Sequence, residues 1–548
     1  MRIRLYNARI LTMEKDRPVF WGEVWVEDDK MIRVAEDRSS AGRSMAGGSL
    51  AGRSMAGGSS AGQPMVGGSS AGQSMVGGFS AGRVIEGEFS ADRSMAEGSS
   101  AGQVITGKFS ADQVMAKESS VNQVMTKGSS ADQVIAEKSS ADRLSAEQPL
   151  AGQLQQRVYR QGQEFTEIRW DMEIDCKGNL LMPGFKNAHT HSGMTFLRSY
   201  ADDVPLQKWL NEKVFPMEAK LSGEDIYHLA KLAVLEYLTS GVTAIFDMYL
   251  KPDETAAACM DTGMRCVLTS GLNDFTSSVK QQEEEYRKWN SGNPLISYQL
   301  GFHSEYTCSK KLLQGVAELA HAYKAPVYTH LAETKKEVEG CRERYGMTPA
   351  VFLDSLGMFE YGGGGYHCVH MTEADMDVFQ KHGMYAVTNP ASNAKLASGI
   401  APIAEYVRRG IPVAIGTDGP ASNNCLDMFR EMFLVSGFSK LREEDASSLD
   451  AAEVLHMATV SGAGAMGLHS ADVLAAGKLA DMILLDLHQP NMQPIHNIPK
   501  NLVYSGSKAN VCMTMVNGKI LYRNGEFHTG ESAEDIYARC EKIVNRIL

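Results

Sequence analysis

Residues 180–191 read LLMPGFKNAHTH, an apolar stretch that runs into His189-Thr190-His191. The apolar residues predict a buried strand, and alternate residues of a strand point to one side, so the two imidazoles share a face. Further short apolar stretches alternate with helical patterns downstream, which is typical of parallel βα units. Eight such units predict a TIM (β/α)8 barrel over residues 183–472. The strands are expected within LLMPGFKNAHTH, VTAIFDM, RCVLTSG, LISYQLGFH, PVYTHLAE, GGYHCVH, MYAVTNP and PVAIGTDG.

Local signals support this division. In SGEDIYHLAKLAVLEYLTSG, Ser222 is expected to cap a helix, acidic residues follow in its first turn, and Gly241 ends it. The glycines of 362–365 are expected as a flexible lead into the sixth strand, because they lack the lysine and helix start of a phosphate-binding loop.

Three flanking segments are rich in short strands and turn signals. Residues 1–36, 157–182 and 473–530 are expected to form one small composite β-sandwich from both chain ends, with a hairpin turn at Asn517-Gly518. Residues 531–548 predict an amphipathic C-terminal helix packed against another element. The fold class is therefore α/β, a barrel with a second, smaller β-domain.

Residues 37–156 interrupt the β-domain with a low-complexity insert. A ten-residue repeat runs eleven times, from SSAGRSMAGG at Ser39 to SSADRLSAEQ at Ser139. Each unit holds only one or two sizeable apolar side chains, so burial cannot offset the entropy of ordering the backbone. The composition predicts disorder. Stacking of the repeats into a solenoid is the alternative, against which the glycine-rich early units argue.

Composition limits the function classes. The chain has 548 residues, of which 43% are apolar, enough to bury a barrel core. Its net charge of −12 would repel nucleic acid and anionic membranes, so a small-molecule substrate is expected instead. There is no apolar run of membrane-spanning length, and the nine cysteines include no C-x-x-C pair. We expect a cytoplasmic homo-oligomer with reduced thiols.

Polar residues gather at or just past the predicted strand ends, where barrel enzymes place their active sites. Three imidazoles and one carboxylate suit Zn2+, and Fe2+ or Mn2+ would fit the same ligands. Bound zinc lowers the pKa of its water toward about 7 and so supplies hydroxide. The predicted metal ligands are His189, His191, His330 and Asp418.

Two of these polar residues are expected to transfer protons, and a third to orient the hydroxide. Asp418 can accept a proton from the water, and Glu333 can carry one to a ring nitrogen and then to departing ammonia. His367 would orient or polarise the hydroxide, whereas His370 is expected to be structural and Cys368 to lie in the core. Hydrogen bonds that shape the pocket are expected from Ser392, Asn393, Ser422 and Asn423.

The chain resembles the 5-methylthioadenosine/S-adenosylhomocysteine deaminases of the amidohydrolase superfamily. The resemblance covers nearly everything except the insert. It implies one metal ion on the four ligands above, with Glu333 and His367 catalytic and Asp418 the base. It also implies that Glu218 holds the ribose hydroxyls of a nucleoside and that His303 contacts the base. The segments that carry it are PGFKNAHTHSGM, FPMEAKLS, SGVTAIFDMY, HSEYTCS, HCVHMTEADM, NPASNAKLASGIAPI, GTDGPASNN and GKLADMILLD.

One departure from the family pattern bears on the substrate. Members that accept the amino-acid tail have an arginine in the third-strand loop, where this chain has Thr269-Ser270-Gly271, and no arginine follows until Arg287. Without this bidentate clamp the preference for S-adenosylhomocysteine is expected to fall, in favour of 5-methylthioadenosine, 5-deoxyadenosine or adenosine.

Two other functions stay open. The same barrel could deaminate or hydrolyse another ring, such as guanine, pterin, cytosine or a chlorotriazine. Binuclear amide hydrolases use a fourth-strand lysine, which LISYQLGFH lacks. The second possibility is a non-catalytic assembly module with the repeat as its adhesive part, against which the complete ligand set argues.

Overall fold

The computed structural model describes residues 1–37, 85–86, 105–106, 159–160, 163–164 and 168–548. The chain divides into two compact units, residues 1–50 with 164–548, and residues 51–163. In the second unit, β4 (Ile85–Glu86) pairs in parallel with β5 (Ile105–Thr106). A separate two-stranded sheet joins β6 (Tyr159–Arg160) to β7 (Gln163–Glu164). The insert was expected to be disordered. Apart from Asp37, β4 and β5, its residues lie outside the described part of the chain.

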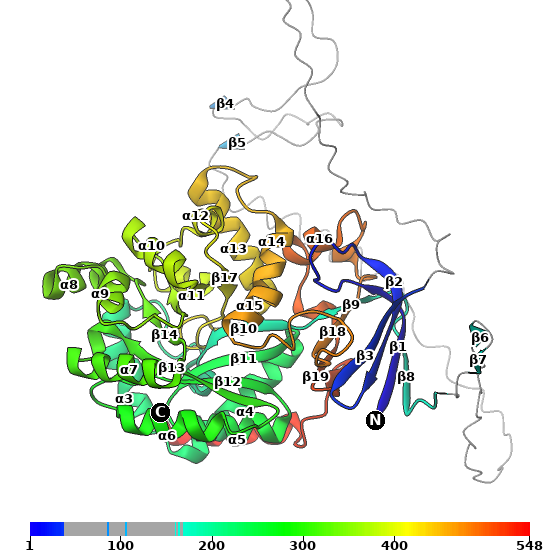
Figure 1. Ribbon diagram of the computed structural model, residues 1–548, viewed down its shortest axis with the longest axis horizontal. Coiled ribbons are helices and arrows are strands. Elements are labelled where there is room, and N and C mark those ends of the chain that lie inside the picture. The colour runs from blue at the N-terminus through cyan, green and yellow to red at the C-terminus, as the bar shows by residue number, and fades with distance from the viewer. Residues whose placement is uncertain (38–84, 87–104, 107–158, 161–162, 165–167) are drawn as a thin grey trace, which may run out of the picture. The chain divides into compact units, whose positions relative to one another are not determined.

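The first unit contains the expected barrel of eight parallel strands, arranged in chain order (Figure 1). The backbone N–H of Asp418 donates to the carbonyl oxygen of His189 at 3.0 Å, and this bond joins the turn after the last strand to the first strand. The barrel strands are β10 (Phe185–Thr190), β11 (Val242–Tyr249), β12 (Arg265–Ser270), β13 (Ile296–Ser304), β14 (Val327–Leu331), β15 (Gly363–His367), β16 (Tyr385–Thr388) and β17 (Val413–Ile415).

The stretch LLMPGFKNAHTH divides into two strands at Gly184. Its first half is β9 (Leu180–Pro183), which belongs to the β-domain, and its second half is β10 of the barrel. A Cβ atom at Gly184 would lie 2.1 Å from Cγ2 of Thr243, so only glycine fits where the chain passes between the two sheets.

Three of the four glycines of 362–365 are part of the sixth strand rather than a flexible lead into it. Gly363, Gly364 and Gly365 are buried residues of β15. A Cβ atom at Gly363 would lie 2.0 Å from the carbonyl oxygen of Val327 on β14. The expectation from sequence was wrong because close packing between strands excludes side chains here, and a glycine run alone does not reveal such packing.

Helices surround the barrel and follow the predicted boundaries. Ser222 caps α4 as expected, in a capping box with Asp225, and Gly241 after its end has φ +76°. The elements around the barrel include α4 (Gly223–Thr239), α5 (Pro252–Thr262), α6 (Val279–Trp289), α7 (Lys310–Tyr323), α8 (Lys335–Tyr345), α9 (Pro349–Ser355), α10 (Glu373–His382), α12 (Ile403–Arg408), α13 (Met428–Glu443), α14 (Ala451–His456) and η5 (Met457–Ser461). The remaining helical elements of this region are η2 (Ser192–Leu197), α2 (Leu206–Lys208), η3 (Trp209–Val214), α3 (Phe215–Glu218), η4 (Glu305–Thr307), α11 (Pro390–Lys395) and α15 (Gly462–Ala465).

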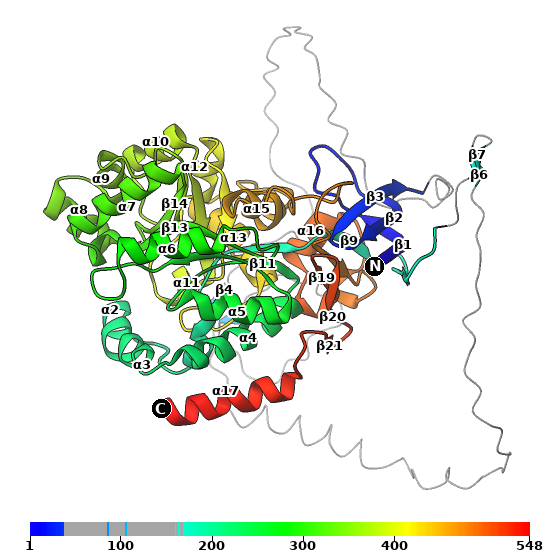
Figure 2. The ribbon, with the colours of Figure 1, turned by 60° about the horizontal axis from the view of Figure 1, so that its bottom comes forward.

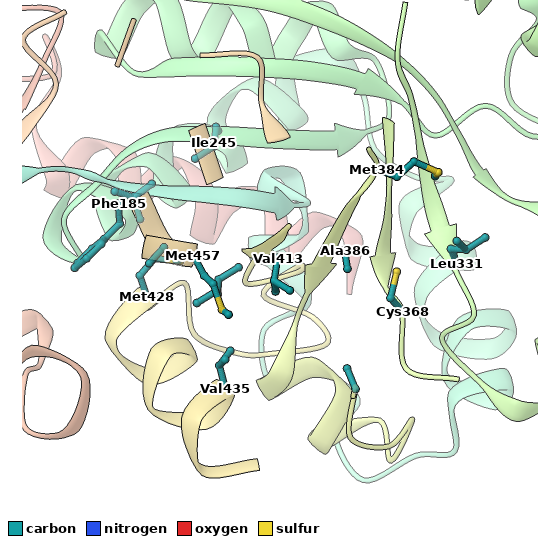
Figure 3. Packing of buried hydrophobic residues seen from close by; sticks show 14 of the residues in the cluster. Phe185, Ile245, Leu331, Cys368, Met384, Ala386, Val413, Met428, Val435 and Met457 are labelled. Carbon is teal, nitrogen blue, oxygen red and sulfur yellow. The ribbon is translucent and has the colours of Figure 1, made fainter. Parts of the chain in front are cut away.

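Apolar side chains fill the layer between strands and helices. Figure 3 shows Val413 of β17, Val435 of α13 and Met457 of η5 in this layer. Cys368 is fully buried there, as predicted. A smaller cluster inside the barrel includes Tyr328, whose hydroxyl donates to the carbonyl oxygen of Ala465 at 2.6 Å. The barrel is therefore a packed support for its C-terminal end.

The β-domain is one mixed nine-stranded sheet built from three separate parts of the chain. Its buried face forms a core of its own, and the turn at Asn517-Gly518 joins β19 to β20 as predicted. Its strands are β1 (Arg2–Ile10), β2 (Phe20–Glu27), β3 (Lys30–Glu36), β8 (Met172–Asp175), β9, β18 (Met482–Leu485), β19 (Val511–Val516), β20 (Lys519–Arg523) and β21 (Glu526–Phe527), and nearby helical elements are η6 (Pro490–Met492), α16 (Ile498–Tyr504) and η7 (Lys508–Asn510).

The C-terminal helix α17 (Ala533–Ile547) packs against α4 of the barrel (Figure 2). Arg546 pairs with Asp225 at 2.6 Å, and the thiol of Cys540 donates to the carbonyl oxygen of His228. This agrees with the expectation of an amphipathic helix on another element. Among the described residues, no helix has the length and apolarity to cross a bilayer.

Candidate metal centre and active site

The four predicted metal ligands come together at the C-terminal end of the barrel. His189 lies on β10 and His191 directly follows it, His330 lies on β14, and Asp418 follows β17. Their ligand atoms all lie within 4.8 Å of one another. Asp418 has φ +59°, a conformation that aspartate tolerates better than most residues and that marks a tight turn after the strand.

Hydrogen bonds fix the orientation of two of the imidazoles. Nδ1 of His330 lies 2.7 Å from the carbonyl oxygen of His303, and Nδ1 of His191 contacts the carbonyl oxygen of Met248. A carbonyl oxygen accepts a hydrogen bond from Nδ1–H, which keeps the proton on Nδ1 and so leaves Nε2 free to ligate. Burial holds the pKa of His330 well below its usual range, which favours the neutral imidazole that metals require.

His189 gives an independent indication of a missing ligand partner. It is fully buried, and neither ring nitrogen has a hydrogen-bond partner among the described residues. Burial also holds the pKa of His189 well below its usual range. An unpaired buried nitrogen is costly, and a metal ion would supply the absent partner. The donor set and its orphaned nitrogen therefore fit a metal ion.

Asp418 is held from both sides. Its Oδ1 lies 3.1 Å from Nε2 of His191, while Oδ2 accepts hydrogen bonds from the hydroxyls of Ser392 at 2.6 Å and Ser422 at 2.7 Å. Burial disfavours the charged carboxylate, but where His191 carries a proton on Nε2 its hydrogen bond and charge outweigh burial and hold the pKa of Asp418 well below its usual range. A bound metal ion would take the place of that proton, because His191 must be neutral to ligate. The carboxylate stays ionised, as a ligand and base must be.

Glu333 and His367 adjoin the four ligands. Glu333 follows β14 and His367 ends β15, and Nε2 of His367 lies 4.0 Å from Oε2 of Glu333. Nδ1 of His367 lies 2.8 Å from Oδ1 of Asn393, which leaves Nε2 facing the site. The hydroxyl of Ser398 donates to Oε1 of Glu333 at 3.0 Å.

The two predicted substrate contacts are also at this end of the barrel. The ring of His303 lies 4.9 Å from that of His330, and burial lowers the pKa of His303 to about 4, so it is neutral. Glu218, the last residue of α3, is nearly buried, and its Oε1 has no hydrogen-bond partner in the described chain. Burial raises the pKa of Glu218 to about 7. Both side chains can still bond to a ligand.

Sequence reasoning missed two tyrosines. Tyr366 stacks on His189, and Tyr249 lies with its ring 6.4 Å from that of His191 and its buried hydroxyl unpaired within the described residues. Tyr366 directly precedes the predicted residue His367 on β15, and Tyr249 ends the family motif SGVTAIFDMY on β11. These positions are the one signal in the sequence that could have found them. Of the expected pocket residues, Asn423 instead donates to Glu431 and to the carbonyl oxygen of Thr417.

The strand GGYHCVH ends earlier than its sequence suggests. His367 and Cys368 have φ +70° and +49°, so the chain turns before His370. Nε2 of His370 lies 2.7 Å from the carbonyl oxygen of Ser398. This contact agrees with the structural role expected for His370. Its partner, Ser398, is the residue whose hydroxyl donates to Glu333.

Comparison with known proteins places this arrangement in a family. The model of the amidohydrolase family matches residues 180–521. The chain belongs to the amidohydrolase family. A 5-methylthioadenosine/S-adenosylhomocysteine deaminase from Caldanaerobacter subterraneus subsp. tengcongensis is 39% identical over 396 residues, covering 71% of this chain and 91% of the relative. The resemblance drawn from the sequence motifs is confirmed.

Two further relatives extend the comparison. A 5'-deoxyadenosine deaminase from Methanothermobacter thermautotrophicus is 40% identical over 368 residues, covering 66% of this amidohydrolase and 86% of the relative. The crystal structure of an adenosine deaminase from Xanthomonas campestris with bound zinc superposes with a TM-score of 0.66 at 33% identity, covering 69% and 88% of the two chains.

Proposed function

We propose that this amidohydrolase is a metal-dependent deaminase of adenosine-type nucleosides, with water as the nucleophile and ammonia as a product. The observation that carries the proposal is the meeting of four ligand atoms within 4.8 Å beside Glu333 and His367. The names of the similar proteins, which include deaminases of 5-methylthioadenosine, S-adenosylhomocysteine and 5'-deoxyadenosine, support the choice of substrate class.

The metal would be held by His189, His191, His330 and Asp418. Zinc is our choice, because three imidazoles and a carboxylate match its preferences and a similar structure contains it, although Fe2+ or Mn2+ has the same donor requirement. When bound, it supplies a Lewis acid that lowers the pKa of a water molecule toward about 7. The fourth barrel strand, Ile296–Ser304, contains no lysine to bridge a second ion.

The protein side chains would divide the proton transfers. The water oxygen bonds to the ring carbon that carries the amino group, and Glu333 transfers one of the water protons to the adjacent ring nitrogen. Asp418 accepts the other, which leaves with ammonia when the carbon–nitrogen bond breaks. His367, with Nδ1 bonded to Asn393, presents Nε2 to orient the attacking water. One water and one aminated ring thus give an oxo ring and ammonia.

The pocket favours a nucleoside with a small 5' substituent. Glu218 would accept the ribose hydroxyls and His303 would contact the base. Ser270 at the end of β12 is buried, and the next arginine, Arg287, already pairs with Glu283 at 2.5 Å on α6. Ser270 has no positive charge and Arg287 already has a carboxylate partner, so neither would replace the bidentate clamp on the carboxylate of S-adenosylhomocysteine. We therefore infer that 5-methylthioadenosine, 5'-deoxyadenosine and adenosine are the better substrates.

Ammonia release and the change in purine absorbance test this function. Purified full-length enzyme is assayed against the four adenosine-type nucleosides and, in parallel, against guanine, a pterin, cytosine and a chlorotriazine. We expect turnover of adenosine-type compounds and its loss in Asp418→Ala. Turnover confined to another ring, or wild-type turnover by Asp418→Ala, would contradict the proposal.

A further inference from the structure

One short segment contacts each of the three side chains that would transfer protons or orient the water in the proposed reaction. It consists of α11 (Pro390–Lys395) and the turn that follows it to Gly399. Its three contacts are Ser392 to Asp418, Asn393 to His367 and Ser398 to Glu333.

The contact of Ser398 with Glu333 distinguishes the two carboxylate oxygens. A carboxylate only accepts, so the Ser398 hydroxyl donates to Oε1, at 3.0 Å. Oε2 faces His367, whose Nε2 is 4.0 Å away. Ser398 and Glu333 are 7% and 9% exposed, so water cannot readily replace this bond. The hydrogen bond therefore occupies one oxygen and directs the other toward the site.

Backbone contacts set the position of the Ser398 hydroxyl. The N–H of Ser398 donates to the carbonyl oxygen of Asn393 at 2.9 Å, and its own carbonyl oxygen lies 2.7 Å from Nε2 of His370. Ala397 has φ +55° and Gly399 φ +128°, so the turn adopts an uncommon conformation on both sides of the serine. These contacts and backbone angles define the shape of the turn, and the shape of the turn sets the position of the Ser398 hydroxyl.

The backbone of Glu333 is held by a different residue. The buried carboxylate of Glu337 accepts the N–H of Ala332 at 2.6 Å and the N–H of Glu333 at 2.8 Å. Loss of the Ser398 hydroxyl would therefore leave the turn after β14 in place. It would free only the rotation of the Glu333 carboxylate.

We propose that Ser398 is a positioning residue for proton transfer by Glu333. It occupies Oε1 and thereby makes Oε2 the oxygen that gives the proton to the ring nitrogen as the bond from water oxygen to ring carbon forms. This inference rests on the proposed deaminase function. It predicts an effect on the chemical step and none on recognition of the ribose by Glu218 or of the base by His303, because these two residues lie on other elements.

Kinetics of Ser398→Ala in the full-length, metal-loaded enzyme test the inference. Loss of a hydrogen bond to a charged group predicts a fall in kcat of about 10- to 100-fold, with KM for 5-methylthioadenosine unchanged. Ser398→Thr keeps a hydroxyl and should restore most of kcat. The matched control is Ser447→Ala, which removes a hydroxyl bonded to the carboxylate of Asp445 at 2.6 Å on the surface and should behave as wild type.

Two further measurements separate positioning from a general structural role. Metal content and thermal midpoint of Ser398→Ala should equal those of wild type. In a Glu333→Gln background, Ser398→Ala should cause no additional loss, because its whole effect passes through Glu333.

The outcomes distinguish the two proposals. Wild-type kcat in Ser398→Ala, a loss of metal that accounts for its defect, or a full additional loss in the Glu333→Gln background would overturn the role of Ser398 alone. A wild-type enzyme that deaminates no adenosine-type nucleoside would overturn the function, and this inference with it.

Discussion

The ring of Tyr366 is stacked on the ring of His189, with centroids 3.7 Å apart and planes inclined by 19°. This face contact orients an imidazole whose two nitrogens have no hydrogen-bond partner within the described residues. His191 and His330, by contrast, are held through Nδ1 by backbone carbonyl oxygens. The first histidine is therefore the ligand that depends most on a metal for a polar partner.

Removal of the metal should abolish ammonia release and destabilise the barrel. A ligand present at 100 times its Kd stabilises the folded state by about 2.7 kcal/mol, a value that already includes the metal's contact with one nitrogen of His189. We expect a lower thermal midpoint after chelation and recovery of both properties on return of Zn2+. Metal analysis with differential scanning calorimetry checks this, and His330→Ala, which lacks a ligand, should not respond. Full activity of metal-free enzyme would contradict it.

The pH dependence of substrate capture should follow Glu218. Burial raises its pKa to about 7, so the carboxylate is protonated below that pH and ionised above it. Only the ionised form can accept from both ribose hydroxyls. We therefore expect kcat/KM for nucleosides to fall about tenfold per pH unit below the pKa.

Substitution of Glu218 isolates this effect. Glu218→Gln should lower kcat/KM at pH 8 by about 10- to 100-fold and remove the fall near pH 7. Glu224→Gln, an exposed acid at the start of α4, is the control and should keep the wild-type profile. Persistence of the same fall near pH 7 in Glu218→Gln would assign it to another group.

The sequence predicted the eight strands, and with them the meeting of His189, His191, His330 and Asp418. This was possible because side chains at the ends of parallel barrel strands converge wherever the strands lie in the chain. The roles of Glu333, His367, Glu218 and His303 stay predictions. The Ser398–Glu333 hydrogen bond joins residues 65 positions apart, and no local pattern encodes it.

The errors have a similar cause. The glycines of β15 were assigned to a flexible lead because their tight contact with β14 depends on tertiary packing. The same holds for the division at Gly184 between two sheets. Periodicity records which face of an element is buried, but not what lies against it.

A buried ion pair should make the junction of barrel and β-domain essential for stability. Arg265 of β12 binds Asp481 through two hydrogen bonds of 2.6 and 3.0 Å, and both side chains are almost fully buried. Asp481→Asn would leave a buried guanidinium without its counter-charge, at a cost of about 3–5 kcal/mol. Urea unfolding measures this loss. The control Glu27→Gln breaks an exposed pair with Arg2 and should cost at most about 1 kcal/mol.

At acid pH, the difference in free energy of unfolding between Asp481→Asn and wild type should become smaller. Burial raises the pKa of Asp481, but the charge of Arg265 outweighs it and holds the pKa below its usual range. The stability from this pair is therefore present above the unfolded-state pKa of about 3.9 and is lost as the pH falls through the lower folded value. An undiminished difference at pH 3 would show that the charge of Asp481 is not the cause.

Deletion of residues 39–148 distinguishes an enzyme from an assembly module. The insert leaves the β-domain after β3 and returns before β8, strands of one sheet, and all the proposed site residues follow it in the chain. The deletion shortens the connection between β3 and β8 about fivefold, which lowers the entropic free-energy cost of closing this loop by on the order of 1 kcal/mol. We expect kcat/KM, thermal midpoint and oligomeric state by light scattering to be unchanged. The deletion leaves the metal ligands untouched, so loss of oligomeric assembly with intact turnover would assign the repeat an adhesive role beside catalysis. Loss of both assembly and turnover would favour the assembly-module interpretation.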